Sequence, residues 1–335
     1  MKGNSIDTVL VGIDEAGLGP ILGPLVVSAA CFSVPADKIQ ADPAASHFAA
    51  ASMWSLLSDS VWSNKKHLAG RLLICDSKKA YTPSTGIAYL EKTVLSCLEI
   101  LGKTPVSITE LIDALCPTCK NRLAQYPWHK DLSHRDIKFN HDDIAISAGA
   151  FGRNLEKHNM SLITLKSFCF DVAFYNEMIG KVNNKSTVLF MAVCSLIDEI
   201  IKSAQHTNFH FIIDRQGGRT KYTRQLRTMF PDMELKVLDE NDNISSYELI
   251  MSGKKVKIDF IVKADADFLP ACLASMVSKY LREQLMGCIN SYFVEKCQNL
   301  KPTAGYWTDG KRFINDLKQI APEIQYDPNQ LIRCR

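Results

Sequence analysis

The sequence predicts an α/β protein with a mixed central sheet flanked by helices. Short apolar runs rich in β-branched residues indicate strands, which first follow one another and later alternate with segments of helical periodicity. That order is typical of a layered fold in which helices cover a mixed sheet. The chain has 335 residues, of which 46% are hydrophobic and 22% charged. This is the composition of a soluble globular protein that can bury a full core.

The elements are predicted from these patterns along the chain. Strands are expected at residues 7–13, 25–33, 71–75, 162–170, 209–213, 233–238 and 256–262. Helices are expected at residues 84–101, 141–157, 185–204, 219–229, 267–293 and 309–318. We expect a single domain over residues 1–335, with insertions at about 36–66 and 103–160 and a C-terminal helical part at about 285–335.

Charge and cysteine content narrow the class of protein. The formal net charge of +3 is too small to identify a partner, although residues 215–227 hold five basic side chains and no acid. The 11 cysteines are an odd number scattered through apolar runs, which indicates buried reduced thiols and not a disulfide framework. The first residues lack the apolar core of a signal peptide, and the longest apolar stretches are too short or too broken to cross a bilayer. We therefore expect a cytoplasmic protein without membrane contact.

Two adjacent carboxylates, Asp14 and Glu15, end the first apolar strand and precede a loop of glycine and proline. Neighbouring side chains on a strand face opposite ways, so both acids can serve one cation only where the chain leaves the sheet. Gly17, Gly19 and Gly23 let the backbone turn and let a ligand or another backbone approach closely. Solvated acids at a strand exit are the simpler alternative.

Two later strands also end on acids, Asp214 and Asp265. Ligands of open α/β sheets bind outside strand ends, so the three acidic ends could meet at one edge. Four unpaired carboxylates would raise their own pKa values and need cations to stay ionised. Such an all-oxygen donor set favours Mg²⁺ or Mn²⁺, and two such ions permit hydrolysis of a phosphodiester. Helix capping is the alternative for either aspartate alone.

The helix expected after Asp265 carries Ser275, Lys279 and Arg282 on one face. A cationic stripe that begins at an acidic site would follow a phosphate backbone, and a solvated helix face is the alternative.

A possible zinc site lies in the second insertion. Cys116, Cys119, His129 and His134 have the types and order of a Cys₂His₂ site. However, only nine residues separate Cys119 from His129, which is shorter than the usual finger spacing. Because a Cys-x-x-Cys pair alone is a weak signal, a reduced pair is the favoured interpretation and a structural Zn²⁺ at Cys116 and Cys119 the less favoured one.

Six motifs, in order along the chain, resemble those of the type 2 ribonucleases H (ribonuclease HII). They are Asp14-Glu15-Ala16-Gly17-Leu18-Gly19-Pro20 with Gly23-Pro24, Asp76-Ser77-Lys78-Lys79, Asn183 before a long helix, the strand-end Asp214, Lys263-Ala264-Asp265 with Ala274-Ser275 and Lys279, and Gly305-Tyr306-Trp307-Thr308. The two insertions have no counterpart in this resemblance.

The resemblance implies a ribonuclease H-like fold in which Asp14, Glu15, Asp214 and Asp265 are the catalytic residues and hold two Mg²⁺ or Mn²⁺ ions. It implies hydrolysis of the RNA strand of an RNA–DNA hybrid, or of DNA that contains ribonucleotides, with 5′-phosphate and 3′-hydroxyl products. The ribose 2′-hydroxyl would be read by the glycine loop and by a tyrosine. The candidate substrate-binding residues are Gly17, Leu18, Gly19, Lys78, Asn183, Arg219, Ser275, Lys279 and Tyr306.

Leu18 departs from the family pattern, which has arginine at this position. Leucine cannot replace a fork-shaped donor, so substrate specificity is affected, above all for single ribonucleotides in DNA. Arg215 or Arg219 could supply the lost charge. Two alternatives therefore stay open: a two-metal nuclease of the same fold with another nucleic-acid substrate, and a non-catalytic nucleic-acid-binding protein. The four intact acids argue against the second alternative.

Overall fold

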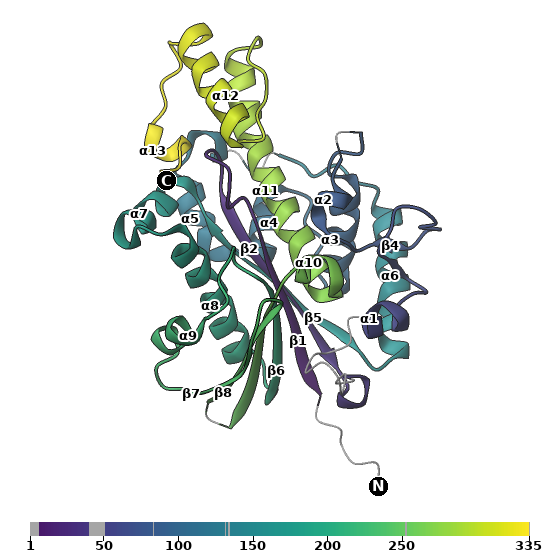
Figure 1. Cartoon of the computed structure of the whole chain (residues 1–335). Coiled ribbons are helices and arrows are strands. Elements are labelled where there is room, and N and C mark those ends of the chain that lie inside the picture. Colours follow the sequence, from purple (N-terminus) through teal and green to yellow (C-terminus); the bar gives the residue numbers. More distant parts are fainter. Residues whose placement is uncertain are drawn as a thin grey trace.

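The computed structural model describes residues 7–39, 51–82, 84–130, 132, 135–251 and 253–334, and its centre is a seven-stranded mixed sheet (Figure 1). The strand order is β5-β2-β1-β6-β9-β8-β7. These strands are β1 (Thr8–Ala16), β2 (Leu25–Val34), β5 (Ser161–Phe170), β6 (Asn208–Asp214), β7 (Glu234–Glu240), β8 (Ile244–Met251) and β9 (Lys254–Ile261). A second, parallel pair consists of β3 (Val61–Trp62) and β4 (Leu72–Leu73).

The strand directions bring three carboxyl ends to one edge of the sheet. β1, β2 and β5 form an antiparallel meander, and β6 and β9 continue the sheet parallel to β1. β8 and β7 then close the far side in antiparallel fashion. The predicted α/β class with a mixed sheet is therefore confirmed, and the acidic ends of β1 and β6 are neighbours.

Helices cover both faces of this sheet (Figure 1). The helices are α1 (Ala51–Leu56), α2 (Ser77–Ala80), α3 (Ala88–Ile100), α4 (Ile108–Leu115), α5 (Lys120–Leu123), α6 (His141–Lys157), α7 (Val172–Val182), α8 (Lys185–Ser203), α9 (Thr223–Met229), α10 (Ala264–Asp267), α11 (Leu269–Lys296), α12 (Trp307–Ile320) and α13 (Pro328–Leu331). One buried cluster joins α3, α6 and α11 to the sheet, and another joins α7 and α8 to its opposite face. All ten residues of β2 are buried, as expected for a strand covered on both sides.

Helix α11 is the element that fixes the site against the sheet. A Cβ atom on Gly12 would lie 2.0 Å from the carbonyl carbon of Pro270, so only glycine lets the first turn of α11 rest on β1. This contact lies two residues before Asp14. The close approach therefore places the polar face of α11 directly beside the acids of β1.

Several predicted elements need correction. The predicted helix 219–229 begins only at Thr223, and the helix 84–101 begins only at Ala88. The predicted helix 267–293 begins at Leu269, because Phe268 adopts an extended conformation between α10 and α11. The strand 71–75 is reduced to two residues, and β3, β8, α4 and α7 were not predicted.

The two predicted insertions differ in content. Residues 40–50 of the segment 36–66 lie outside the described residues, and the remainder contains α1 and the strand β3. The segment 103–160 contains α4, α5 and α6. In the C-terminal part, α11 continues past residue 285 to Lys296, and α12 and α13 follow.

None of the helices in the described ranges has the length and apolar character needed to traverse a lipid bilayer. The 11 cysteines are free thiols and nine of them are buried, which confirms the expectation of buried reduced cysteines.

Candidate active site

A cavity of about 200 Å³ opens at the carboxyl ends of β1 and β6. It is lined by Asp14, Glu15, Ala16, Gly17, Leu18, Gly19, Pro20, Ser77, Lys78, Asp214, Asp265, Ser275, Lys279, Arg282 and Tyr306. The four predicted acids thus share one cavity with seven of the nine predicted substrate contacts. Asn183 and Arg219 do not line it.

The acids of β1 do not lie where the chain leaves the sheet, contrary to the expectation from their spacing. Asp14 and Glu15 still pair with β2, and β1 continues to Ala16. The parallel pairing of β1 with β6 ends at Ile13, one residue before Asp14. The cavity therefore opens where β1 and β6 separate, and both acids of β1 line it while their backbone stays in the sheet.

The side chain of Asp214 contacts the start of a helix, but not of the helix that follows it in sequence. Its Oδ1 accepts a hydrogen bond of 2.8 Å from the backbone N–H of Ala264, at the start of α10. The backbone N–H of Asp265 also hydrogen-bonds to Asp214 and, like that of Ala264, lowers the pKa of this carboxyl. The capping alternative, in which Asp214 is itself a helix N-cap residue, is therefore wrong, because Tyr222 holds that position before α9 and Lys263 before α10. Lys263, with φ of 62°, makes the left-handed turn from β9 into α10.

The four carboxylates carry negative charge that the protein does not neutralise. Burial, followed by the charges of the neighbouring acids, raises the pKa of Asp14 well above its usual value, that of Glu15 to about 7 and that of Asp214 to about 6. Burial, and then the charge of Asp76, also raises the pKa of Asp265. Their only ion pair within the described ranges joins Lys78 Nζ to Asp265 Oδ2 at 3.8 Å. The Lys78 side chain is 83% exposed, so solvent screens this contact.

Helix α11 positions the acids through hydroxyl groups. A hydrogen bond from Ser275 lowers the pKa of Asp14, and the Ser275 Oγ lies 2.9 Å from the Oγ of Ser77. One turn later, the Ser278 hydroxyl donates a 2.9 Å hydrogen bond to the backbone carbonyl of Asp14. Both the backbone and the carboxylate of Asp14 are therefore held from the same helix.

The predicted cationic stripe of α11 does line the cavity, but its charges are partly paired. Lys279 Nζ lies 2.8 Å from Glu283 Oε1, and Arg282 Nη1 lies 3.2 Å from the same oxygen. Lys279 also lies over the ring of Tyr81, with its Nζ 4.8 Å from the centroid. Glu283 therefore reduces the positive charge that the spacing of Ser275, Lys279 and Arg282 suggests.

The loop after Glu15 depends on glycine at one position. Gly17 has φ of +95°, and a Cβ atom there would lie 2.6 Å from Nε of Arg282 and from the carbonyl oxygen of Pro24. Gly19, in contrast, has open space where its Cβ would lie. The side chain of Arg333, which no sequence signal singled out, donates hydrogen bonds to the carbonyls of Gly17 at 2.6 Å and of Pro20.

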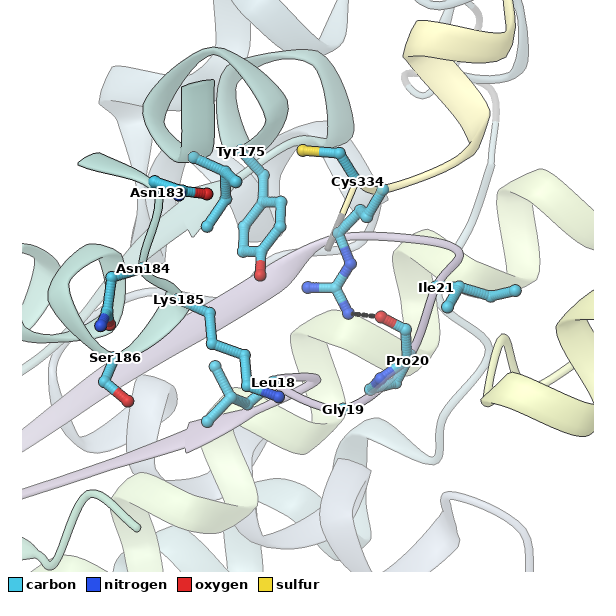
Figure 2. Close-up of a pocket in the computed structure, with 12 residues that line it drawn as sticks. Leu18, Gly19, Pro20, Ile21, Tyr175, Asn183, Asn184, Lys185, Ser186 and Cys334 are labelled. Carbon is cyan, nitrogen blue, oxygen red and sulfur yellow. Dashed lines mark hydrogen bonds between the residues drawn. The ribbon is translucent and has the colours of Figure 1, made fainter. Parts of the chain in front are cut away.

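Three other basic or polar candidates lie elsewhere. Asn183 follows α7 in a left-handed conformation and lines a second pocket beside the loop (Figure 2). Arg219 precedes α9, with its guanidinium carbon 5.5 Å from the ring centroid of Tyr222. Arg215 donates to the carbonyls of Asn241 and Asp242. Neither Arg215 nor Arg219 lines the carboxylate cavity, and that one of them supplies the lost charge stays a prediction.

The cysteine pair forms a buried thiol cluster. The Sγ atoms of Cys116 and Cys119 lie 3.2 Å apart, and a hydrogen bond links Cys119 to Cys169. His129 is buried against the rings of Tyr126 and Trp128. His134 lies outside the described residues.

The donor set of the cavity fits hard divalent cations. Its ligating groups are carboxylate oxygens, which suit Mg²⁺ or Mn²⁺. In the part of the chain that the structure describes, no three His, Cys, Asp or Glu side chains are already arranged around one point as ligands. Burial and neighbouring acids raise the pKa values of Asp14, Glu15 and Asp214, and bound divalent cations would favour the ionised forms of these side chains.

No protein-family profile matches the sequence. No curated protein matches it either. Solved structures that match along nearly the whole chain include Bst ribonuclease HIII in complex with Mn²⁺, at 14% identity and a TM-score of 0.42, covering 98% of this chain and 67% of that one. Ribonuclease HII of Archaeoglobus fulgidus, in its complex with PCNA, matches at 14% identity and a TM-score of 0.39, and the match covers 98% of this chain and 94% of that one. Ribonuclease H2 of Pyrococcus horikoshii OT3 matches at 11% identity and a TM-score of 0.38, and the match covers 96% of this chain and 92% of that one. At these identities and TM-scores, the similarity does not assign a function to this chain.

Proposed function

We propose that this protein is a metal-dependent endoribonuclease that hydrolyses the RNA strand of RNA–DNA hybrids or the ribonucleotides within DNA. One observation carries the proposal: four carboxylates from β1, β6 and α10 line a single cavity, and burial and the charges of nearby acids raise their pKa values. A cluster of acids with strongly perturbed pKa values in a cleft is typical of a catalytic site. We assign residues 1–335 to one catalytic domain with insertions at about 36–66 and 103–160.

Asp14, Glu15, Asp214 and Asp265 would hold two Mg²⁺ or Mn²⁺ ions. When bound, such ions activate water and neutralise the charge that develops on the scissile phosphate. The protein contributes the positions of the acids: Ser275 orients the carboxylate of Asp14, and the first N–H groups of α10 orient that of Asp214. Lys78, with its side chain 83% exposed beside Asp265, would contact a phosphate of the substrate strand.

The loop from Gly17 to Pro20 and the side chain of Tyr306 would distinguish RNA from DNA. Both line the cavity, and Tyr306 is 50% exposed, with its ring centroid 5.7 Å from the guanidinium carbon of Arg282. The carbonyl of Gly17 already accepts a hydrogen bond from Arg333, so a ribose 2′-hydroxyl would meet the N–H groups of this loop.

A second candidate is a two-metal nuclease with another nucleic-acid substrate. Leu18 supports it, because a leucine side chain lines the cavity where a guanidinium would contact phosphate or base. This candidate keeps the four acids in the same roles and differs only in the strand that is bound.

The deciding experiment measures cleavage of four matched duplexes by the purified chain in Mg²⁺ or Mn²⁺. They are an RNA–DNA hybrid, DNA with one ribonucleotide, double-stranded RNA, and DNA. We expect cleavage of the hybrid, and we expect Asp214→Asn to lower its rate by at least about a hundredfold, the typical cost of one transition-state contact. Asp267→Asn is the matched control, because Asp267 is exposed on the same short helix and does not line the cavity.

Equal cleavage of DNA would favour the second candidate. If the chain cut none of the duplexes, and Asp214→Asn bound the hybrid as wild type does, the nuclease proposal would fail.

A further inference from the structure

A second pocket, of about 510 Å³, adjoins the loop from Gly17 to Pro20 (Figure 2). It shares Leu18, Gly19 and Pro20 with the carboxylate cavity. The remaining lining residues come from the loop itself, from α7, from the start of α8 and from the C-terminal segment: Ile21, Tyr175, Ile179, Asn183, Asn184, Lys185, Ser186, Arg333 and Cys334. No aspartate or glutamate is among these described lining residues. The two pockets that share this loop therefore differ in composition, because only the carboxylate cavity holds acids.

Arg333 is a buried cation in this pocket without a partner anion. The residue is 4% exposed, and no carboxylate in the described ranges pairs with it. Its Nη2 donates to the carbonyls of Gly17 and Pro20, and the second of these bonds is drawn as the dashed line in Figure 2. Its Nε and Nη1 have no hydrogen-bond partner within the described part of the chain. The guanidinium carbon lies 4.7 Å from the ring centroid of Tyr175. Because a buried cation with no anion beside it is costly, a bound anion would stabilise this arrangement further.

The backbone holds Arg333 in this place. The N–H of Arg333 donates a 2.8 Å hydrogen bond to the carbonyl of Ile21. Asn176 on α7 clamps the segment from the other side, because its amide donates to the carbonyl of Ile332 at 2.9 Å and accepts from the N–H of Cys334 at 2.7 Å. The guanidinium is therefore fixed beneath the loop by contacts on both flanks.

The start of helix α8 adds donors to the same pocket. The side chain of Asn184 caps the helix by accepting a 3.0 Å hydrogen bond from the N–H of Thr187. The N–H groups of Lys185 and Ser186 begin the helix, where no intrahelical acceptor is available, and the helix dipole is positive there. In Figure 2, the exposed side chain of Lys185 extends from the start of α8 toward Leu18. A helix N-terminus, a lysine and a buried arginine thus face one pocket, which is a donor set for phosphate.

We propose that this pocket binds a phosphodiester group of the nucleic-acid backbone, held by Lys185 and the first N–H groups of α8 and by the charge of Arg333. The inference rests on the proposed function, because the shared loop lets one strand reach both the pocket and the carboxylate cavity. Arg333 supplies from the C-terminal segment the positive charge that Leu18 does not provide. The pocket thus determines where the strand is held relative to the acids.

The test measures binding of a fluorescent RNA–DNA hybrid by anisotropy, with divalent metal chelated so that no cleavage occurs. We expect Lys185→Gln and Arg333→Gln each to weaken binding by about tenfold, the typical value of a hydrogen-bonded charge contact. Each should also reduce the slope of log K against log salt by about 0.9, the contribution of one phosphate contact. Lys202→Gln is the matched control, because Lys202 lies near the other end of α8 and pairs with Asp198.

A modified substrate locates the contact. Single phosphates of the hybrid are replaced, one at a time, by neutral methylphosphonates. At one position this replacement should weaken binding to the wild type by about tenfold, whereas it should leave binding to the Lys185→Gln variant unchanged. Lys185→Gln removes no hydrogen bond described within the fold, so it decides the matter even if Arg333→Gln disturbs the loop. Unchanged affinity and salt slope in a folded Lys185→Gln variant would overturn the inference. Binding of inorganic phosphate without any effect of Lys185→Gln on the hybrid would also overturn it.

The inference and the proposed function fail in different ways. If Asp214→Asn abolishes cleavage while Lys185→Gln binds the hybrid as wild type does, only the phosphate pocket is wrong. If no duplex is cleaved while Lys185→Gln and Arg333→Gln weaken binding, the pocket is supported and the nuclease proposal fails.

Discussion

Asp259 on β9 differs from the acids of the carboxylate cavity, which lie on β1, at the end of β6 and in α10, in how its charge is compensated. Asp259 on β9 is 1% exposed and surrounded by partners. His210 Nε2 lies 2.7 Å from its Oδ2, Lys257 Nζ lies 3.2 Å from the same oxygen, and Ser246 donates a hydrogen bond to its Oδ1. Asp214 and the other acids of the cavity have neither histidine nor arginine partners within the described ranges.

The pKa values follow this difference. Burial acts to raise the pKa of Asp259, but the charges of His210 and Lys257 and the hydrogen bonds from His210 and Ser246 outweigh it and hold the pKa below its usual value. Burial and the charge of Asp265 raise the pKa of Asp214 to about 6. A compensated acid stabilises the fold, whereas an uncompensated group of acids creates a demand for a counter-ion. The contrast predicts opposite effects for the same substitution at the two places.

The largest effect is expected for Asp259→Asn. Removing the negative charge leaves His210 and Lys257 beside a neutral amide in the sheet, so the free energy of unfolding should fall by about 3 kcal/mol. The cleavage rate per folded molecule should stay as in wild type, because Asp259 does not line the cavity. Urea unfolding followed by circular dichroism measures the first quantity. A variant as stable as wild type would remove the distinction between Asp259 and the acids of the cavity.

Asp214→Asn should do the opposite in the metal-free protein. Below about pH 3, Asp214 is protonated in both the folded and the unfolded state, and the substitution changes little. Because the folded pKa is raised to about 6, ionising Asp214 costs folding free energy, and this cost grows as pH rises from about 4 to 7. At pH 7.5 the free energy of unfolding of the variant should therefore be about 2 kcal/mol higher than that of the wild type. Unfolding curves at pH 4.5 and 7.5 in chelator provide the measurement.

Added metal sharpens this prediction. Mg²⁺ should stabilise the wild type at pH 7.5 and have a smaller effect on Asp214→Asn, because binding to the folded state adds to the unfolding free energy. Equal stabilisation of both proteins by Mg²⁺ would contradict the assignment of Asp214 as a ligand.

Local sequence patterns predicted the acidic edge because each acid lies next to the strand that carries it. Asp14 and Asp214 follow apolar runs, and parallel strands bring such ends together. The strand β8 escaped prediction, because its two serines at 245 and 246 interrupt the apolar pattern although both are buried in the sheet.

Contacts between distant segments could not be predicted in this way. Arg333 binds the carbonyl of Gly17 across 316 positions of sequence, and a lone arginine near the C-terminus carries no motif. The pairing of His210 with Asp259 likewise depends on the register of β6 and β9, which only the folded sheet defines. The sequence therefore predicts functional residues that end a strand, but it does not predict those whose role depends on a neighbour distant in sequence.

The smallest effect is expected for the hydroxyl groups that hold Asp14. Ser275→Ala removes the hydrogen bond that lowers the pKa of the Asp14 carboxyl, so its ionised form loses about 1 kcal/mol and Mg²⁺ affinity near neutral pH should fall about fivefold. Ser278→Ala is the matched control, because its hydroxyl binds the backbone carbonyl of Asp14 and not the carboxylate. It should lower the free energy of unfolding by about 1 kcal/mol and leave Mg²⁺ affinity unchanged. Titration calorimetry of both variants with Mg²⁺ separates the two roles. If both lost affinity equally, Ser275 would act on the acids only through the packing of α11.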